Sequence, residues 1–283
     1  MPSFCFVWKI SYHPCDRAFG SCWQRAKLYL KRRTNIVYIM PTETNNIGEV
    51  TALFDRWLKE QGTPQSYDWL QSEIAQISTP TGSKSLFIAY SSVSRHHKKQ
   101  NLNLPLEELN KFPTEDWNPD NWTLDRIARS LLLLSYPSED AENYVATLEK
   151  IIGAADVEEA IAFYQSLPLL PHPEKFKLRA AEGVRTNMTS VFNAVAHNNP
   201  YPAKYLDDLA WNQMVLKALF VGSPLHPIYG LEQRNNPQLA QMLIDYARER
   251  LAANRTVSDE LWELVRPFQP EVVKELKATT ISS

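Results

Sequence analysis

Residues 124–134 read Leu-Asp-Arg-Ile-Ala-Arg-Ser-Leu-Leu-Leu-Leu, the most regular stretch of the 283-residue chain. Their apolar side chains recur at helical spacing. Thr123 stands directly before them, where a hydroxyl side chain favours a helix N-cap, and Tyr136-Pro137 follows them, where a helix has to end. The stretch therefore predicts a helix with defined ends.

Similar patterns lie on both sides of this helix. Apolar residues recur at helical spacing over 47–58, 67–77, 86–93, 144–152 and 157–167, and a further helix is expected over 174–182. Ser138 and Asp156 are the expected N-caps of the two helices that follow 124–134. Helices of about 12–18 residues joined by short links are typical of helical hairpins stacked as in an α-solenoid.

The composition also favours an all-α fold. The chain has 8 Gly and 19 Pro; tight β-turns consume glycine, whereas prolines separate helices. No segment alternates with a period of two, and no repeat of fixed length is found. We therefore predict stacked helical hairpins that form one α-solenoid-like domain over 40–283. A Pro- and Asn-rich connector over 101–121 carries one short expected helix, Leu106–Leu109.

Residues 1–39 differ from the rest of the chain. They hold all three cysteines and seven Lys or Arg against Asp16 alone, a net charge of +6; the remainder has 23 basic and 31 acidic side chains, a net charge of −8. We interpret the segment as a basic leader that is disordered or results from a start site placed upstream of Met40, with a targeting segment as the alternative. A protein that starts at Met40 has no cysteine, hence neither a disulfide nor a catalytic thiol.

Several classes of protein are excluded by what the sequence lacks. No run of 18 apolar residues is present, so no transmembrane helix is expected. Phosphate-loop, dinucleotide-binding, zinc-protease, hydrolase and kinase motifs are missing, and basic residues do not interleave with aromatic ones as in nucleic-acid-binding proteins. His96-His97 is interpreted as a solvated helix end. We expect a cytoplasmic protein with no metal, cofactor or nucleic-acid partner.

The candidate functional residues lie mainly in 185–221. A helix that Thr186 or Asn187 could cap has an expected buried stripe of Met188, Val191, Phe192 and Val195. On this helix Asn193 and His197 are four residues apart, so they share a face and could reach a common ligand or each other.

The stretch 209–221 is apolar nearly all round, which predicts a buried helix. Asp207-Asp208 provide negative charge at the start of this helix. Its polar side chains then need hydrogen-bond partners, either within the protein as internal braces or in a ligand. The candidate binding residues, with no catalytic or metal-binding residue assigned, are Arg185, Asn187, Asn193, His197, Tyr201, Trp211, Asn212, Gln213, Lys217 and Arg234.

The same block resembles the EboA family. The resemblance is carried by Arg185-Thr-Asn, Asn198-Asn-Pro-Tyr-Pro-Ala, Ala210-Trp-Asn-Gln-Met-Val-Leu-Lys-Ala-Leu-Phe, Gly222-Ser-Pro-Leu, Gly230-Leu-Glu-Gln-Arg-Asn-Asn-Pro, Asp245-Tyr-Ala-Arg-Glu-Arg and Leu261-Trp-Glu-Leu-Val. Residues 122–134 look similar as well, so the resemblance covers about 120–267 well, 47–119 weakly and 1–39 not at all. One departure is Glu263, where an arginine is expected after Trp262; it puts a salt bridge or anion contact of relatives in doubt.

The resemblance implies a cytosolic, mainly helical protein of a metabolite-traffic gene set in bacteria, cyanobacteria among them, and in some algae. That set looks as if it prepares or moves secondary-metabolite precursors towards and across a membrane, and it includes a prenyltransferase-like membrane protein. The implied partners are a small-molecule metabolite or other proteins of the set, with peripheral association with the membrane protein as one option. No catalytic residues come with the resemblance.

Two hypotheses about function follow. The first is a non-catalytic adaptor or carrier that binds a small metabolite or a partner protein through the polar strip of 211–220 with Arg185, His197 and Tyr201; the missing catalytic motifs favour it. The second is an enzyme of the same pathway with His197 as general acid or base and Lys217 or Arg185 stabilising an anion. A purely structural subunit is the third option.

Overall fold

The computed structural model describes residues 46–79, 81–105, 108, 117, 119 and 122–281. Throughout these residues the backbone forms helices and connecting segments, with two isolated antiparallel bridges (Asn101 with Thr123, and His197 with Ile228) and no strand. The prediction of an all-α fold is therefore confirmed. The predicted leader 1–39 lies outside the described residues, as does the expected helix Leu106–Leu109 apart from Glu108.

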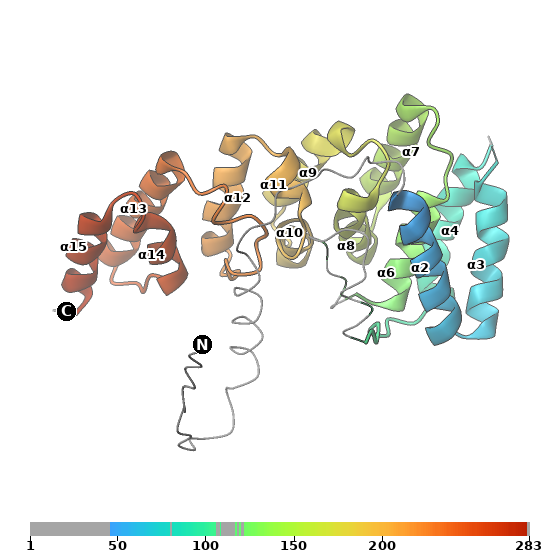
Figure 1. Cartoon of the computed structure of the whole chain (residues 1–283), viewed down its shortest axis with the longest axis horizontal. Coiled ribbons are helices and arrows are strands. Elements are labelled where there is room, and N and C mark those ends of the chain that lie inside the picture. The colour runs from blue at the N-terminus through green and yellow to red at the C-terminus, as the bar shows by residue number, and fades with distance from the viewer. Residues whose placement is uncertain are drawn as a thin grey trace, which may run out of the picture. The chain divides into compact units, whose positions relative to one another are not determined.

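The elements run along the chain as Figure 1 labels them. They are α2 (Asn46–Gln61), α3 (Pro64–Ile77), α4 (Ser83–His96), α6 (Leu124–Leu134), α7 (Ala141–Ala154), α8 (Val157–Ser166), the 3-10 turns η1 (Leu167–Leu169) and η2 (Pro173–Phe176), α9 (Lys177–Arg185), α10 (Thr189–Ala196), α11 (Tyr201–Tyr205), α12 (Asp208–Phe220), α13 (Pro237–Ala252), α14 (Asp259–Val265) and α15 (Pro270–Ile281). Within the described ranges, none of them is both long and apolar enough to cross a lipid bilayer.

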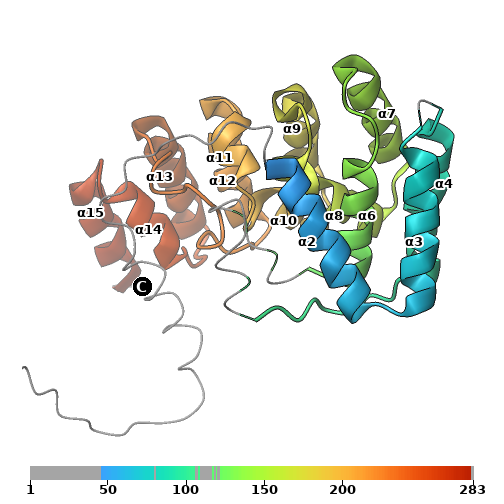
Figure 2. The ribbon, with the colours of Figure 1, turned by 45° about the vertical axis from the view of Figure 1, so that its right-hand side comes forward.

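Most helices pack against helices that are near them in the chain. α6 contacts α4 and α8, α8 contacts α10, and α9, α12 and α13 continue the series to α14 and α15. In Figure 1 these helices follow one another in chain order from α6 to α15. α2 departs from this order because it lies against α6, as Figure 2 also shows. Packing between chain neighbours is the arrangement of an α-solenoid.

Local hydrogen bonds explain where two of the helices begin. At the start of α8, the Asp156 carboxylate accepts from the Glu159 amide at 2.8 Å, and the Glu159 carboxylate accepts from the Asp156 amide at 2.9 Å. This reciprocal pair is a capping box. At the start of α12, the Asp207 carboxylate accepts from the Ala210 amide at 2.8 Å. Both starts agree with the sequence prediction.

Two other N-caps differ from the prediction. α7 is capped by Asp140 rather than by Ser138: the Asp140 carboxylate oxygen accepts from the amides of Glu142 and Asn143, each at 3.1 Å. Hydrogen bonds from amides to an ionised carboxylate are stronger than those to a hydroxyl, which favours Asp140 over Ser138. Thr123 does occupy the N-cap position of α6, but its hydroxyl makes no capping bond.

The predicted burial around α10 and α12 is wrong in part. Met188 is 49% exposed and occupies the N-cap position of α10, which neither Thr186 nor Asn187 caps. On α12, Leu209 and Phe220 are 57% and 62% exposed. The Phe220 ring still contacts α13, where it meets Tyr246 edge to face with ring centroids 4.9 Å apart.

Candidate functional site

One face of α10 lies opposite one face of α8 across an open pocket of about 220 Å³. α10 supplies Ser190, Asn193 and Ala194, and His197 follows it directly; the four share a face because they are three or four residues apart. The other described lining residues are Ile161 and Gln165 of α8, Trp117, Trp122, Arg126, Asn198 and Asn199. Neither here nor elsewhere in the described residues do three or more His, Cys, Asp or Glu gather where they could hold a metal ion.

Two tryptophans form an aromatic wall of the pocket. The rings of Trp117 and Trp122 meet edge to face, with centroids 4.7 Å apart. The backbone around Trp122 is fixed to the segment after α4, because its carbonyl oxygen accepts from the Leu102 amide at 2.8 Å. The indole N–H of Trp117 donates to the Gln165 carbonyl oxygen of α8 at 3.4 Å. These bonds position the aromatic wall against α8.

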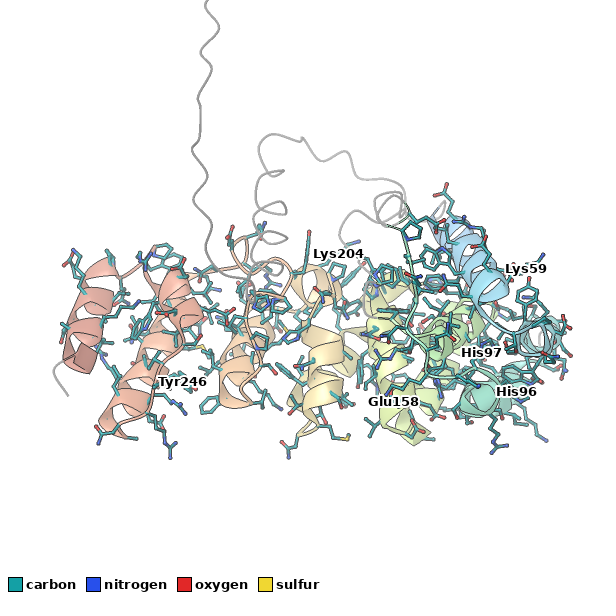
Figure 3. The ribbon with its side chains drawn as sticks, turned by 90° about the horizontal axis from the view of Figure 1, so that it is seen from below. Lys59, His96, His97, Glu158, Lys204 and Tyr246 are labelled. Atoms are coloured by element: carbon teal, nitrogen blue, oxygen red, sulfur yellow. The ribbon has the colours of Figure 1, made fainter. Side chains whose placement is uncertain are left out.

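Arg126 of α6 brings a positive charge to the pocket. Its side chain is only 14% exposed, and its Nη2 lies 3.4 Å from the Glu158 carboxylate of α8, which Figure 3 labels. The other Glu158 oxygen accepts from Lys99 Nζ at 2.5 Å. Partial burial raises the pKa of Glu158, but the hydrogen bond and charge of Lys99, together with Arg126, lower it overall. Glu158 is therefore ionised between two cations.

Asn193 and His197 share a face, as predicted, and both bind the turn after α12. Asn193 Oδ1 accepts from the Ser223 hydroxyl at 2.7 Å, and His197 Nε2 lies 3.0 Å from the Pro224 carbonyl oxygen. Because a carbonyl oxygen only accepts, Nε2 carries the hydrogen and the neutral ring has an acceptor at Nδ1. Burial lowers the pKa of His197 despite this bond, which keeps the ring neutral at pH 7.

The loop after α10 fixes the base of the pocket. Asn198 has a left-handed backbone (φ 50°), which turns the chain so that Asn199 is buried. The Asn199 amide group donates to the carbonyl oxygens of Tyr164 at 2.9 Å and Ala194 at 3.0 Å, and its oxygen accepts from the Tyr201 amide at 3.0 Å. A single asparagine thus joins α8, α10 and α11.

Gln165 differs from Asn199 in its hydrogen bonding. Its Oε1 is buried and finds no donor among the residues that the structure describes. An unpaired buried amide oxygen costs about 1–3 kcal/mol, so most such groups in proteins have a partner. The lining of the pocket therefore includes a side-chain amide oxygen whose hydrogen-bonding capacity the described residues do not use.

Four of the sequence candidates form braces elsewhere. The amides of Asn212 on α12 and Asn236 bond each other at 2.9 and 3.2 Å. The Arg234 guanidinium lies 5.0 Å from the Trp211 ring and donates to carbonyl oxygens at the end of α11. Tyr201 is fully buried, and its hydroxyl donates to a backbone carbonyl. The structure thus engages these side chains in internal contacts.

The remaining candidates also lie away from the pocket. Arg185, Asn187 and Gln213 are exposed. Lys217 donates to the carbonyl oxygen of Thr186 at 2.6 Å and so joins α12 to the end of α9. Of the ten candidates, the pocket thus brings together Asn193 and His197.

Four of the lining residues were not predicted from the sequence: Trp117, Trp122, Arg126 and Gln165. Trp122 and Arg126 belong to the regular stretch around 124–134, whose pattern indicates a helix and nothing about a site. Gln165 follows Ile161 by four residues, a spacing that placed both on one face of a helix. The sequence gives no signal that this face meets α10.

His97 was predicted wrongly as part of a solvated helix end. His96 is exposed and stacks on Trp69 with ring centroids 4.0 Å apart, whereas His97 is buried (Figure 3). Burial, followed by the charge of His96, lowers the pKa of His97 to about 4. On α6, Asp125 raises this pKa and Arg129 lowers it. This polar cluster was not predicted because its members come from α4 and α6.

The family model described as Metabolite traffic protein EboA matches residues 50–266. No curated protein and no solved structure matches the chain.

Proposed function

Because this chain belongs to the EboA family, described as metabolite traffic proteins, we propose that it is a non-catalytic carrier that binds a small metabolite between α8 and α10. The observation that carries the proposal is the pocket itself, where amide, imidazole and guanidinium groups gather beside two tryptophans. Small-molecule sites typically combine an apolar wall with a few polar groups that orient the ligand. The Gln165 amide oxygen, for which the described residues offer no donor, supports the same assignment.

The size of the pocket favours a small guest. Its volume of about 220 Å³ is below the roughly 300–1,000 Å³ of pockets that hold drug-sized ligands. The proposal therefore concerns a metabolite of low molecular mass, or one end of a larger one. The proposed partners that deliver or receive it are other proteins of the same gene set in the cytoplasm, on the strength of the family resemblance alone.

The geometry around His197 favours binding over turnover. A general base needs a nitrogen that reaches the substrate and a second group that orients the ring. His197 is oriented by a carbonyl oxygen, Pro224, and its pKa is lowered, which weakens its Nδ1 as a base near pH 7. Asn193 bonds Ser223 rather than the imidazole. The enzyme hypothesis stays the alternative.

A pair of substitutions on α10 tests the proposal. Ser190 lines the pocket, so Ser190→Phe should fill it, whereas Thr189→Phe adds the same ring at a neighbouring exposed position outside the lining. The full-length chain is incubated with the small-molecule fraction of a source-cell extract and examined by native mass spectrometry. We expect a defined mass on the wild type and on Thr189→Phe but not on Ser190→Phe. No retained compound, or equal retention by both variants, would overturn the proposal.

A further inference from the structure

Gln165 brings a buried hydrogen-bond acceptor to the pocket. It is one of the lining residues, and no described residue donates to its buried Oε1. A buried amide oxygen is normally paired, because burial removes the water that would otherwise donate to it. A ligand that donates a hydrogen would complete this bond. We infer that the metabolite bound between α8 and α10 carries a neutral hydroxyl or N–H group that donates to Gln165 Oε1. This inference rests on the proposed function.

The end of α8 holds the backbone of Gln165 in place. The preceding carbonyl oxygen, that of Tyr164, accepts from the loop after α10 at 2.9 Å, and the Gln165 carbonyl oxygen accepts from the Trp117 indole at 3.4 Å. The next side chain, Ser166, has its hydroxyl 2.6 Å from that of Ser130 on α6. The acceptor therefore extends from a backbone that its neighbours fix. Less ordering is then needed when a ligand binds, which favours affinity.

The rest of the lining indicates which kind of donor fits. Its described residues include no Asp or Glu, so a cationic donor such as an ammonium group would have no counter-charge among them. Because the Trp117 indole N–H bonds the Gln165 backbone, the aromatic wall lies beside the acceptor. The edge-to-face rings of Trp117 and Trp122 suit a flat ring as their neighbour. The ligand class is thus a neutral aromatic molecule with a hydroxyl or N–H group.

Two pairs of isomers test for the donor without a change in size. 3-Methylindole has an N–H group that 1-methylindole lacks, and 4-methylphenol has a hydroxyl group that anisole lacks. Binding of each probe to the full-length chain is measured by NMR titration. One hydrogen bond to a buried acceptor favours the donor isomer about fivefold, so we expect at least this ratio of affinities for one pair. The pair with the larger ratio identifies the donor as N–H or hydroxyl.

Variants of two glutamines complete the test. Gln165→Leu removes the acceptor at similar size, so the ratio should fall to about one while the isomers without a donor still bind. Because no described residue donates to the Gln165 amide oxygen, this variant should resist urea at least as well as the wild type. Gln213→Leu makes the same change at an exposed position of α12 outside the described lining, and it should keep the ratio.

The outcomes separate this inference from the proposed function. Equal affinities within both pairs, with binding blocked by Ser190→Phe, would overturn the donor and leave the carrier in place. A ratio that survives in Gln165→Leu would also overturn it, as would binding of none of the four probes. A loss of stability in Gln165→Leu would do the same, because it would show that the amide is bonded within the protein. The proposed function itself fails only when the extract yields no compound that Ser190→Phe excludes.

Discussion

Nη1 of Arg129 lies 2.9 Å from Oδ2 of Asp125, one turn earlier on α6, and the two side chains are only 1% and 5% exposed. Few ion pairs are so completely removed from water. The Arg129 guanidinium also lies over the Tyr90 ring, 5.9 Å from its centroid. The pair therefore sits inside the packing between α4 and α6, where each charge depends on the other.

Removing one member of this pair should be costly. Arg129→Met leaves the Asp125 carboxylate buried without its counter-charge, and such losses cost about 3–5 kcal/mol. We expect urea unfolding of this variant to show a decrease of that size in the free energy of unfolding. Asp125→Leu combined with Arg129→Met removes both charges and should recover most of it, since apolar pairs often replace buried ion pairs at little cost. A single variant as stable as the wild type would contradict a buried, interdependent pair.

His97 predicts an acid-sensitive component of stability. Its pKa is lowered from 6.5 to about 4 in the folded protein, so between these values the unfolded chain binds more protons. The contribution of neutral His97 to the free energy of unfolding is complete above pH 6.5. It is lost as the pH falls to 4, a decrease of about 3 kcal/mol. We expect unfolding measured along this pH range to show the decrease in the wild type and not in His97→Gln.

His96→Gln, at the exposed neighbouring position, should keep most of the decrease, because the charge of His96 contributes less than burial to the lowered pKa of His97. Carboxylates with lowered pKa values, such as Glu158 and Glu260, also lose stabilising interactions in acid, so the informative quantity is the difference between variant and wild type. Equal pH dependence of His97→Gln and the wild type would show that His97 is not buried as a neutral ring.

The helices could be predicted because their signals are local. The apolar spacing in 124–134 and the carboxylates of Asp156 and Asp207 act within one or two turns, and α6, α8 and α12 begin where these signals place them. The errors at Ser138 and Met188 are also local. At α7 the error arose because Ser138 and Asp140 lie two residues apart, and the spacing alone does not rank them as N-caps.

The pocket could be predicted only in part because it is assembled from distant segments. The four-residue spacing of Asn193 and His197 correctly placed them on one face. That face meets Gln165 and Trp117, which come from other parts of the chain, and helical periodicity does not say which helix will be opposite. For the same reason the spacing could not show that Asn212 bonds Asn236 while Gln213, the next residue, is exposed.

The Asn212–Asn236 pair is expected to act as a brace. Asn212→Ala removes both hydrogen bonds to the half-buried Asn236 amide, which should lower the free energy of unfolding by about 1–3 kcal/mol. Since neither residue lines the pocket, retention of the ligand from extract should not change. In a double-mutant cycle, the variant with both Asn212→Ala and Asn236→Ala should lose less free energy of unfolding than the sum of the two single losses, because both substitutions interrupt the same contact. Loss of the ligand in Asn212→Ala with unchanged stability would instead place Asn212 in a binding site.

His197 distinguishes a carrier from an enzyme. In His197→Gln the side-chain amide can still donate to the Pro224 carbonyl oxygen, so the variant should fold. Its ligand affinity should change by no more than about threefold, which is less than the contribution of one hydrogen bond. Affinity is read by titration with the retained compound, and any conversion of that compound by mass spectrometry over time. If the protein is a carrier, the compound stays chemically unchanged with the wild type and with His197→Gln. Conversion by the wild type that His197→Gln abolishes while binding persists would establish His197 as an acid–base residue and replace the carrier with the enzyme.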